Sequence, residues 1–135
     1  MLGEKIGVIN GDTATKTLPA ANNGVPVLET STQGAGTLYG IDVQSMATYQ
    51  AMLNKDGSWQ GECPNQGVIM AADGVATFTA TGVGHMTENG GNKFRGAVYF
   101  HTEAASLAKL NGTCFVYEWD VDADGQAVWN IWEWR

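Results

Sequence analysis

The sequence predicts an all-β protein: a single antiparallel up-and-down β-barrel of about eight strands with one short helix. Glycine accounts for 18 of the 135 residues and proline for 3, a composition suited to tight turns and kinked strands. Asp-Gly or Asn-Gly pairs recur at 56–57, 73–74, 89–90 and 124–125 between apolar runs, which is a typical hairpin signal. The length fits one domain over residues 1–135.

In chain order, the first element expected is a hairpin over residues 4–18 that turns at 10–12. Strands are expected to follow over 25–32, over 36–53 with a kink at Gly40, and over 58–70 with an interruption near Pro64. The last strands are expected over 75–87, 93–102, 113–121 and 126–135. Because tight turns join most of them, the order predicts a meander rather than alternating strands and helices.

One segment, 103–110, has helical spacing. Leu107 and Leu110 are three residues apart among alanines, Thr102 is a candidate N-cap, and Gly112 is a candidate stop. The pattern predicts a helix of about two turns. We expect it to cross one end of the barrel as a plug or a corner connection.

The C-terminal strand is apolar on both faces. Trp129 and Ile131 alternate onto one face, while Trp132 and Trp134 lie on the other. An antiparallel strand that is wet on one side should be apolar on one face only. The interior of a barrel covers one face, so the pattern predicts that a second copy of the chain covers the other. A homo-oligomer is expected, most simply a dimer.

Three stretches carry a resemblance to a known family: residues 67–84 (GVIMAADGVATFTATGVG), residues 94–112 (FRGAVYFHTEAASLAKLNG), and FVYEWDVDADG followed by IWEW. They resemble a small uncharacterised bacterial protein family with a barrel similar to allene oxide cyclase and to lipocalins. The resemblance implies an eight-stranded antiparallel barrel. It carries over no catalytic residue, because the family has no established activity and the plant cyclase shares only the fold.

The charge of the chain argues against nucleic acids and anionic membranes as partners. The net charge is −7, and the only basic cluster is Lys93 with Arg95. The start, MLGEKIGVING, lacks the basic and apolar regions of a secretory signal, and no apolar stretch has transmembrane length. A soluble cytoplasmic protein is therefore expected, with Cys63 and Cys114 reduced and packed as small apolar side chains.

Neither a metal nor a cofactor is expected. DVDADG at 120–125 begins like a calcium loop, but Ile131 occupies the position of the bidentate glutamate, so an acidic hairpin turn is favoured. His85 and His101 are the only histidines, too few for a typical zinc site. Gly82 and Gly84 share one strand face and suggest close approach of another strand, a bulge or a ligand.

The candidate site rests on the sidedness of one strand. Arg95, Tyr99 and His101 share a face, and if that face points inward they line the lumen. Such polar groups form either an internal network of hydrogen bonds and salt bridges or a ligand site, and the sequence leaves both open. The residues predicted to bind a ligand are Arg95, Tyr99, His101, Glu118, Glu62 and Gln66.

Binding of a small, partly apolar molecule in the barrel is the function that the sequence favours. One alternative is a cofactor-independent isomerase or cyclase, suggested by the fold resemblance and a possible Glu/His acid–base pair. The other is a solid structural or interaction barrel that acts through its outer surface. Whether the protein catalyses any reaction is left open, because no Ser-His-Asp arrangement or nucleophile elbow is present.

Overall fold

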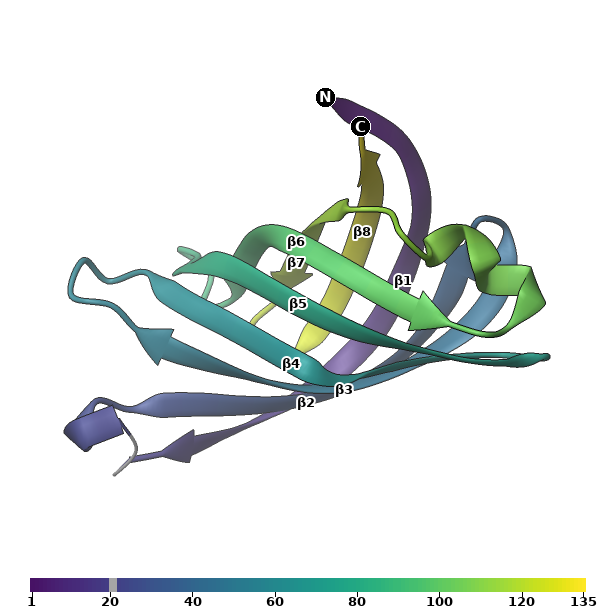
Figure 1. Cartoon of the computed structure of the whole chain (residues 1–135). Coiled ribbons are helices and arrows are strands. Elements are labelled where there is room, and N and C mark those ends of the chain that lie inside the picture. The colour runs from purple at the N-terminus through teal and green to yellow at the C-terminus, as the bar shows by residue number, and fades with distance from the viewer. Residues whose placement is uncertain (20–21) are drawn as a thin grey trace.

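The computed structural model describes residues 1–19 and 22–135, and over these it shows a closed antiparallel barrel of eight strands in chain order (Figure 1). The predicted fold class is therefore confirmed. Two short 3-10 helices accompany the strands within the described residues: η1 (Asn22–Gly24) and η2 (Ala105–Leu110). The strands are β1 (Leu2–Leu18), β2 (Val27–Leu38), β3 (Ile41–Leu53), β4 (Trp59–Ala71), β5 (Gly74–Met86), β6 (Asn92–Thr102), β7 (Phe115–Val121) and β8 (Gln126–Trp134).

The hairpin expected over 4–18 is wrong, because β1 runs through this segment as one strand. At Gly11 it pairs with Gly34 of β2 on one side and with Ala127 of β8 on the other, so β1 closes the barrel. The strand expected over 36–53 is instead two strands. Tyr39 and Gly40, with φ of 51° and 76°, form the tight turn between β2 and β3.

Glycine allows β1 and β2 to bend together around one corner of the barrel. A Cβ atom at Gly36 would collide with the carbonyl oxygen of Val8, and one at Gly7 would collide with that of Thr37. These positions have ordinary strand φ values, so glycine is required for close backbone approach rather than for an unusual conformation. The strong curvature of β1 is visible in Figure 1.

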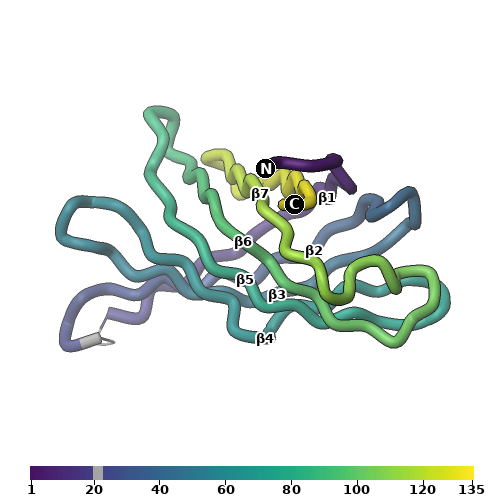
Figure 2. The backbone as a smooth tube through the Cα atoms, turned by 45° about the horizontal axis from the view of Figure 1, so that its top comes forward, coloured from purple at the N-terminus to yellow at the C-terminus, as the bar shows by residue number. Residues whose placement is uncertain are grey.

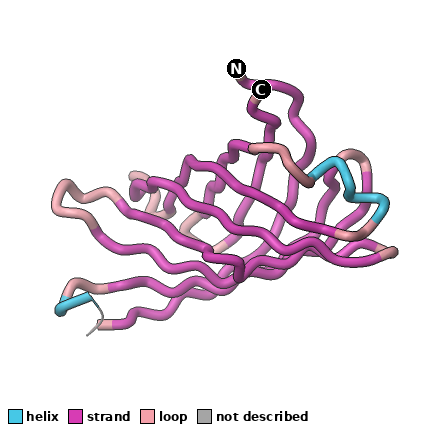
Figure 3. Tube along the Cα trace, in the orientation of Figure 1, coloured by secondary structure: helices cyan, strands magenta, loops and turns pink. Residues whose placement is uncertain are grey.

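The barrel has two different ends. The helix end holds η2, the Tyr39–Gly40 turn and both termini, which meet where the N-terminal ammonium donates a hydrogen bond to the Arg135 carbonyl oxygen at 2.6 Å (Figure 2). The hairpin end holds the connections that follow β1, β3, β5 and β7. Figure 3 shows η2 at the edge of the barrel, beside the end of β6.

The short helix lies at the helix end beside β6, where the sequence predicts a plug or a corner connection. Leu107 and Leu110 are fully buried and join the main core. The predicted start at Thr102 is wrong: the N-cap is Ala104, which has no capping side chain of its own, and Asp73 Oδ2 from the β4–β5 turn accepts a hydrogen bond from the Ser106 N–H at 3.0 Å. The Thr102 hydroxyl instead accepts a hydrogen bond from the Ala104 N–H at 3.0 Å, a local bond that competes with helix formation.

Trp129 lies at the centre of the barrel core. Its ring is 5.1 Å from that of Phe78 and 6.3 Å from those of Phe100 and Trp119, with tilted or edge-to-face geometry. Trp132 points outward, with the Lys5 ammonium 5.5 Å above its ring. The two-faced pattern of β8 therefore separates a packed interior from an outer surface that remains partly exposed in the single chain.

A polar cluster ties the helix end together. The Tyr39 hydroxyl donates a hydrogen bond to Glu133 Oε1 at 2.8 Å, while Arg135 Nε and Nη2 donate to Glu133 Oε2 at 2.9 and 2.7 Å. The Lys109 ammonium of η2 lies 5.4 Å above the Tyr39 ring. The hydrogen bonds from Tyr39 and then from Arg135 hold the pKa of Glu133 below its ordinary value of 4.5.

Acid should therefore weaken this end of the barrel. Because the pKa of Glu133 is lower in the folded state, its stabilising contribution is present above the ordinary value of 4.5 and is lost as the pH falls through the folded pKa. We expect Glu133→Gln to reduce the urea midpoint at neutral pH and to reduce the loss of stability on acidification. Tyr39→Phe should do the same to a smaller extent. An identical dependence of the midpoint on pH in Glu133→Gln and wild type would contradict this.

Candidate functional site

The interior of the barrel holds a cavity of about 60 Å³ between the packed helix end and the hairpin end. All eight strands contribute to its wall, and most of the side chains on it are apolar or aromatic. The lining residues are Ile9, Gly11, Thr32, Gly34, Ser45, Ala47, Tyr49, Gly61, Glu62, Cys63, Phe78, Ala80, Phe94, Tyr117, Trp119 and Trp129.

Aromatic rings cover glycines on the inner faces of β4 and β5. The Phe94 ring lies over Gly84, and the Tyr117 hydroxyl would be 2.5 Å from a Cβ atom at Gly82. The close approach predicted at Gly82 and Gly84 is thus made by aromatic side chains from β6 and β7. Rings stacked over glycine fill much of the lumen and leave the cavity between them.

A hydrogen-bonded pair of aromatic side chains spans the lumen above the cavity. Trp119 Nε1 of β7 donates to the Tyr49 hydroxyl of β3 at 3.0 Å, and the two rings meet edge to face at 6.2 Å. These strands are four apart in an eight-stranded barrel, so they lie on opposite walls. We call this pair the Tyr49–Trp119 bridge. Both side chains are only partly buried, whereas Phe78 and Trp129 below them are buried.

The wall of the cavity carries little charge. Among the described lining residues, Glu62 alone has an ionisable carboxyl, and its Oε1 accepts a hydrogen bond from Gln60 Nε2 at 3.0 Å. Burial raises the pKa of the Cys63 thiol, which therefore stays protonated, and it likewise raises the pKa of Tyr117. The lumen suits an uncharged molecule better than an ion.

The inward orientation considered for Arg95, Tyr99 and His101 does not hold, because all three lie exposed on the outer face of β6. The inner face of this strand is formed by Phe94, Val98 and Phe100, all of which are buried. Burying a guanidinium and an imidazole would cost free energy, whereas burying these apolar side chains is favourable. That difference decides which face of β6 points inward. Contacts of Arg95, Tyr99 or His101 with a ligand could be made only on the outer surface.

The other predicted site residues are also placed away from the lumen, except for Glu62 at its edge. Glu118 lies half-exposed on the outer face of β7, 3.8 Å from Arg95 Nε, and Arg95 Nη1 pairs with Asp120 Oδ1 at 2.7 Å. Gln66 is exposed in a bulge that interrupts the pairing of β4 with both neighbours. Arg95 and Glu118 thus belong to a charged network, but this network lies on the outside of the barrel rather than inside it.

The bulge in β4 lies where the sequence predicts an interruption near Pro64. Pairing with β5 breaks between Cys63 and Gly67, and Asn65 adopts a φ of 57°. A non-glycine residue in this region is uncommon and is often found at bulges and turns. The bulge lies beside the cavity, because Cys63 on its flank is a lining residue.

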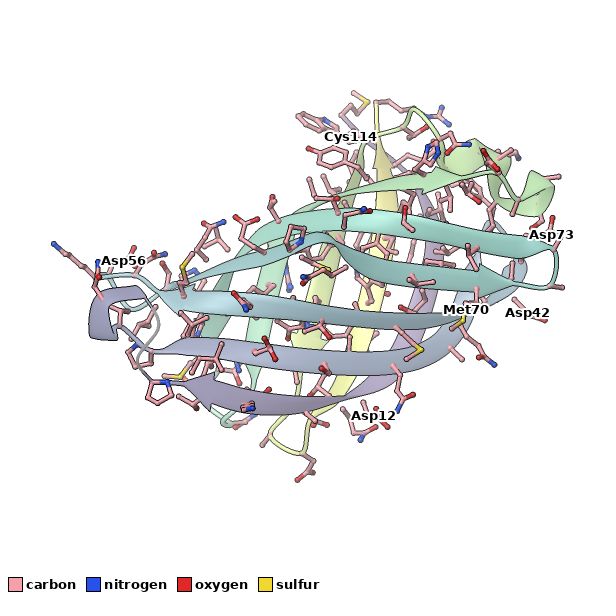
Figure 4. The ribbon with its side chains drawn as sticks, turned by 60° about the horizontal axis from the view of Figure 1, so that its bottom comes forward. Asp12, Asp42, Asp56, Met70, Asp73 and Cys114 are labelled. Carbon is pink, nitrogen blue, oxygen red and sulfur yellow. The ribbon has the colours of Figure 1, made fainter. Side chains whose placement is uncertain are left out.

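A wide, open groove of about 970 Å³ crosses the outer surface. Asp12 of β1 and Met70 of β4 both contribute to it and project outward in Figure 4. Gly11, Gly34 and Ser45 line both this groove and the inner cavity, so the barrel wall is thin between them. The groove mixes amide, acidic, basic and methionine side chains.

The described part of the chain brings no metal-ligating set together. Within residues 1–19 and 22–135, no three His, Cys, Asp or Glu side chains gather closely enough to hold a metal ion. The acidic segment forms the predicted hairpin turn between β7 and β8, where Asp122 Oδ1 accepts hydrogen bonds from the Asp124 and Gln126 N–H groups at 2.9 Å. Across the described part of the chain, no helix is both long and apolar enough to cross a membrane.

Comparison with known proteins finds similar folds but no protein of known function. No protein-family model and no curated protein matches the chain. Similar crystal structures include a conserved protein of unknown function from Rhodopseudomonas palustris, with a TM-score of 0.80 and 14% identity, covering 98% of this chain and 97% of that one. A protein with unknown function from Clostridium acetobutylicum ATCC 824 has a TM-score of 0.80 and 10% identity over 98% and 97% of the chains.

A third similar structure is a "beta-barrel like protein" from Acinetobacter baumannii AYE. Its TM-score is 0.75 at 10% identity, and the match covers 98% of this chain and 94% of that one. Matches over nearly the whole length of each protein show that this barrel fold recurs in other proteins. At these identities they show the fold alone, which the chain shares with uncharacterised proteins.

Proposed function

We propose that the protein binds a small, uncharged, mainly apolar molecule inside the barrel. The observation that carries the proposal is the aromatic-lined cavity below the Tyr49–Trp119 bridge. Ligand sites are typically concave and apolar, with a few polar groups that fix orientation. The Thr32, Ser45 and Tyr49 hydroxyls supply such groups here.

The size of the cavity limits the ligand. About 60 Å³ is well below the roughly 300–1,000 Å³ of typical ligand pockets and below the roughly 150 Å³ of a cavity that accepts benzene. A ring-sized ligand therefore requires the bridge to open. Opening requires Tyr49 and Trp119 to break the hydrogen bond between them and Tyr49 to move away from the Phe94 ring, which lies 6.0 Å from its own.

The resemblance to allene oxide cyclase would favour a cofactor-independent cyclase, but the lumen gives this alternative little support. His85 and His101 are both exposed, and the carboxylate of Glu62 at the cavity edge has no histidine partner among the described lining residues. An acid–base mechanism needs both groups within reach of one substrate. The residues that line the cavity therefore favour ligand binding over acid–base catalysis.

Ligand binding can be tested with benzene and phenol as ring-sized neutral probes and laurate as a charged, long-chain one. We expect benzene and phenol to quench the fluorescence of Trp119 and Trp129. Each should also raise the melting temperature by about 5 °C at roughly ten times its Kd. Laurate should do neither. The absence of both effects with both ring compounds would overturn the proposal.

Substitutions that fill the cavity, compared with an equal substitution on the outer face, test where the probes bind. Ala80 lines the lumen and Ala97 lies on the outer face of the adjacent strand, so Ala80→Leu should abolish both responses while Ala97→Leu keeps them. Ala47→Leu fills the same cavity from β3 and serves where Ala80→Leu perturbs folding. Probe binding retained in folded, cavity-filled variants would place the binding site elsewhere.

We further propose that two copies associate through an outer aromatic patch formed by Tyr99, Trp132 and Trp134. Tyr99 is 50% and Trp134 56% exposed in the single chain. Exposed aromatic side chains of this kind are enriched at interfaces. The net charge of −7 opposes association, so added salt should strengthen it.

Sedimentation equilibrium checks the dimer directly. We expect the wild type to have the mass of a dimer at micromolar concentration and Trp132→Ala to shift it toward the monomer. Val83→Ala serves as a control, because Val83 is exposed on β5 outside the patch. A monomeric wild type at low and high salt would contradict the proposal.

We also propose that the protein is located in the cytoplasm. It is supported by the two cysteines, which are both free, with Cys63 buried and Cys114 partly buried. Oxidising compartments favour disulfides in small domains, whereas a reducing compartment keeps such thiols free.

A further inference from the structure

Trp59 carries a buried hydrogen-bond donor without an acceptor. The residue is 8% exposed, and its Nε1 atom is shielded from solvent but has no hydrogen-bond partner among residues 1–19 and 22–135. An indole N–H can only donate. Polar groups buried away from water normally find partners, because an unsatisfied group loses its solvation without compensation. The missing acceptor therefore points to a molecule other than this chain.

Trp59 lies on the inner face of β4, between the cavity and the hairpin end. It shares this face with Gly61 and Cys63, which are buried and line the cavity, while Gln60 between them is only partly buried. Trp59 is also the first residue of β4, directly after the β3–β4 connection at the hairpin end. A ligand that enters the lumen from that end passes this side chain.

Phe94 connects Trp59 to the wall of the cavity. Trp59, Phe94 and Ala51 form one buried apolar cluster, and Phe94 is also a lining residue. In the sheet, Gly84 pairs with Trp59 on one side and with Phe94 on the other. Trp119 of the bridge packs against the same cluster. Opening of the bridge, which a ring-sized ligand requires, therefore takes place beside the Trp59 indole.

Other donors of the lumen are already engaged. Trp119 Nε1 donates to the Tyr49 hydroxyl at 3.0 Å, and the Tyr117 hydroxyl donates to the Thr81 carbonyl oxygen at 3.0 Å. The other buried side-chain atom that lacks a partner in the described chain is an acceptor, Asn92 Oδ1, on a residue that lines the outer groove. The indole of Trp59 is thus the buried side-chain donor that a ligand in the lumen can satisfy.

We propose that Trp59 Nε1 donates a hydrogen bond to the ligand, and that the ligand is an uncharged, apolar ring compound with a carbonyl oxygen. This inference rests on the proposed ligand-binding function. A carbonyl oxygen accepts the indole N–H without bringing a donor of its own, which the apolar cluster around Trp59 would leave unsatisfied. A site that hydrogen-bonds a polar group of its ligand discriminates against the analogue that lacks the group.

The first test compares cyclohexanone with methylenecyclohexane, in which a CH₂ group replaces the carbonyl oxygen. Their dissociation constants are measured by calorimetry in wild type and in Trp59→Phe, which removes the N–H and keeps an aromatic ring. We expect the affinity for cyclohexanone relative to methylenecyclohexane to fall about tenfold in the variant, equal to about 1.4 kcal/mol. Using the ratio of the two probes cancels any general loosening of the cavity.

The indole N–H resonances of the isotope-labelled wild type report the hydrogen bond directly, so this second measurement needs no variant that folds. Cyclohexanone should move the Trp59 N–H proton resonance downfield, whereas methylenecyclohexane should not. The Trp134 N–H serves as the control within the same molecule, because this side chain is 56% exposed on β8. Its resonance should not move downfield with either probe.

The outcomes separate the two proposals. If benzene and phenol bind but cyclohexanone leaves the Trp59 resonance unmoved, the Trp59 anchor is overturned and the binding function stands. An affinity ratio that is the same in wild type and in folded Trp59→Phe overturns the anchor as well. If none of the four compounds binds the wild type, the proposed function falls and the anchor with it.

Discussion

Gly36→Ala is expected to destabilise the barrel by about 3 kcal/mol or more, a large share of the stability of a small domain. A Cβ atom at Gly36 would meet the Val8 carbonyl oxygen and would lie 2.7 Å from the Cα of Ile9, both backbone atoms of the paired strand β1. Replacing glycine by alanine also restricts the unfolded chain, which stabilises by only about 0.4–1 kcal/mol. The clash therefore dominates, and the urea midpoint should fall sharply.

Gly61→Ala is the matched control. Gly61 is also a strand glycine, but the nearest atom to its Cβ would be Cε1 of Phe94 at 3.1 Å, the edge of a ring that can shift. Its unfolding free energy should change by no more than about 1 kcal/mol. Equal stability of Gly36→Ala and wild type would show that the β1–β2 corner is looser than the structure indicates.

Local sequence signals predict most of the strands, whereas the course of β1 depends on long-range pairing. Alternating apolar residues and Asp-Gly or Asn-Gly pairs identify the strands from β4 onward to within a few residues, because pattern and turn are local signals. The sequence predicts a turn at 10–12, because NGD is a turn signal, but this segment lies in the middle of β1. Its pairing with β2 on one side and β8 on the other holds it extended, and β8 lies more than 100 residues away in the chain.

The candidate site was less predictable than the fold. A guanidinium and an imidazole are typical ligand-binding groups, which makes Arg95 and His101 candidates for the lumen. The alternate residues Phe94, Val98 and Phe100 gain more from burial and take the inner face. For β3, the alternation of Val43, Ser45 and Ala47 with polar or exposed neighbours was a usable signal for the lumen. The Tyr49–Trp119 bridge was not predictable, because it joins strands on opposite walls and depends on barrel closure.

Trp129→Ala is expected to destabilise the protein by about 3–5 kcal/mol, the usual cost of deleting a buried aromatic side chain. Trp129 is 5% exposed and contacts the rings of Phe78, Phe100, Tyr117 and Trp119. Trp134→Ala is the control in the same strand: Trp134 is 56% exposed, so its loss should cost less than about 1 kcal/mol. Urea unfolding of both variants measures the difference.

The Trp129→Ala variant also connects packing to function. Removing the indole extends the cavity below the bridge, so free indole should bind in the space and restore part of the lost stability. At about ten times its Kd, the gain should be about 1.4 kcal/mol. Indole should have a smaller effect on the wild type, whose cavity is about 60 Å³. If Trp129→Ala is destabilised but indole gives no gain, the interior collapses on truncation, and a ligand site in this lumen loses its physical basis.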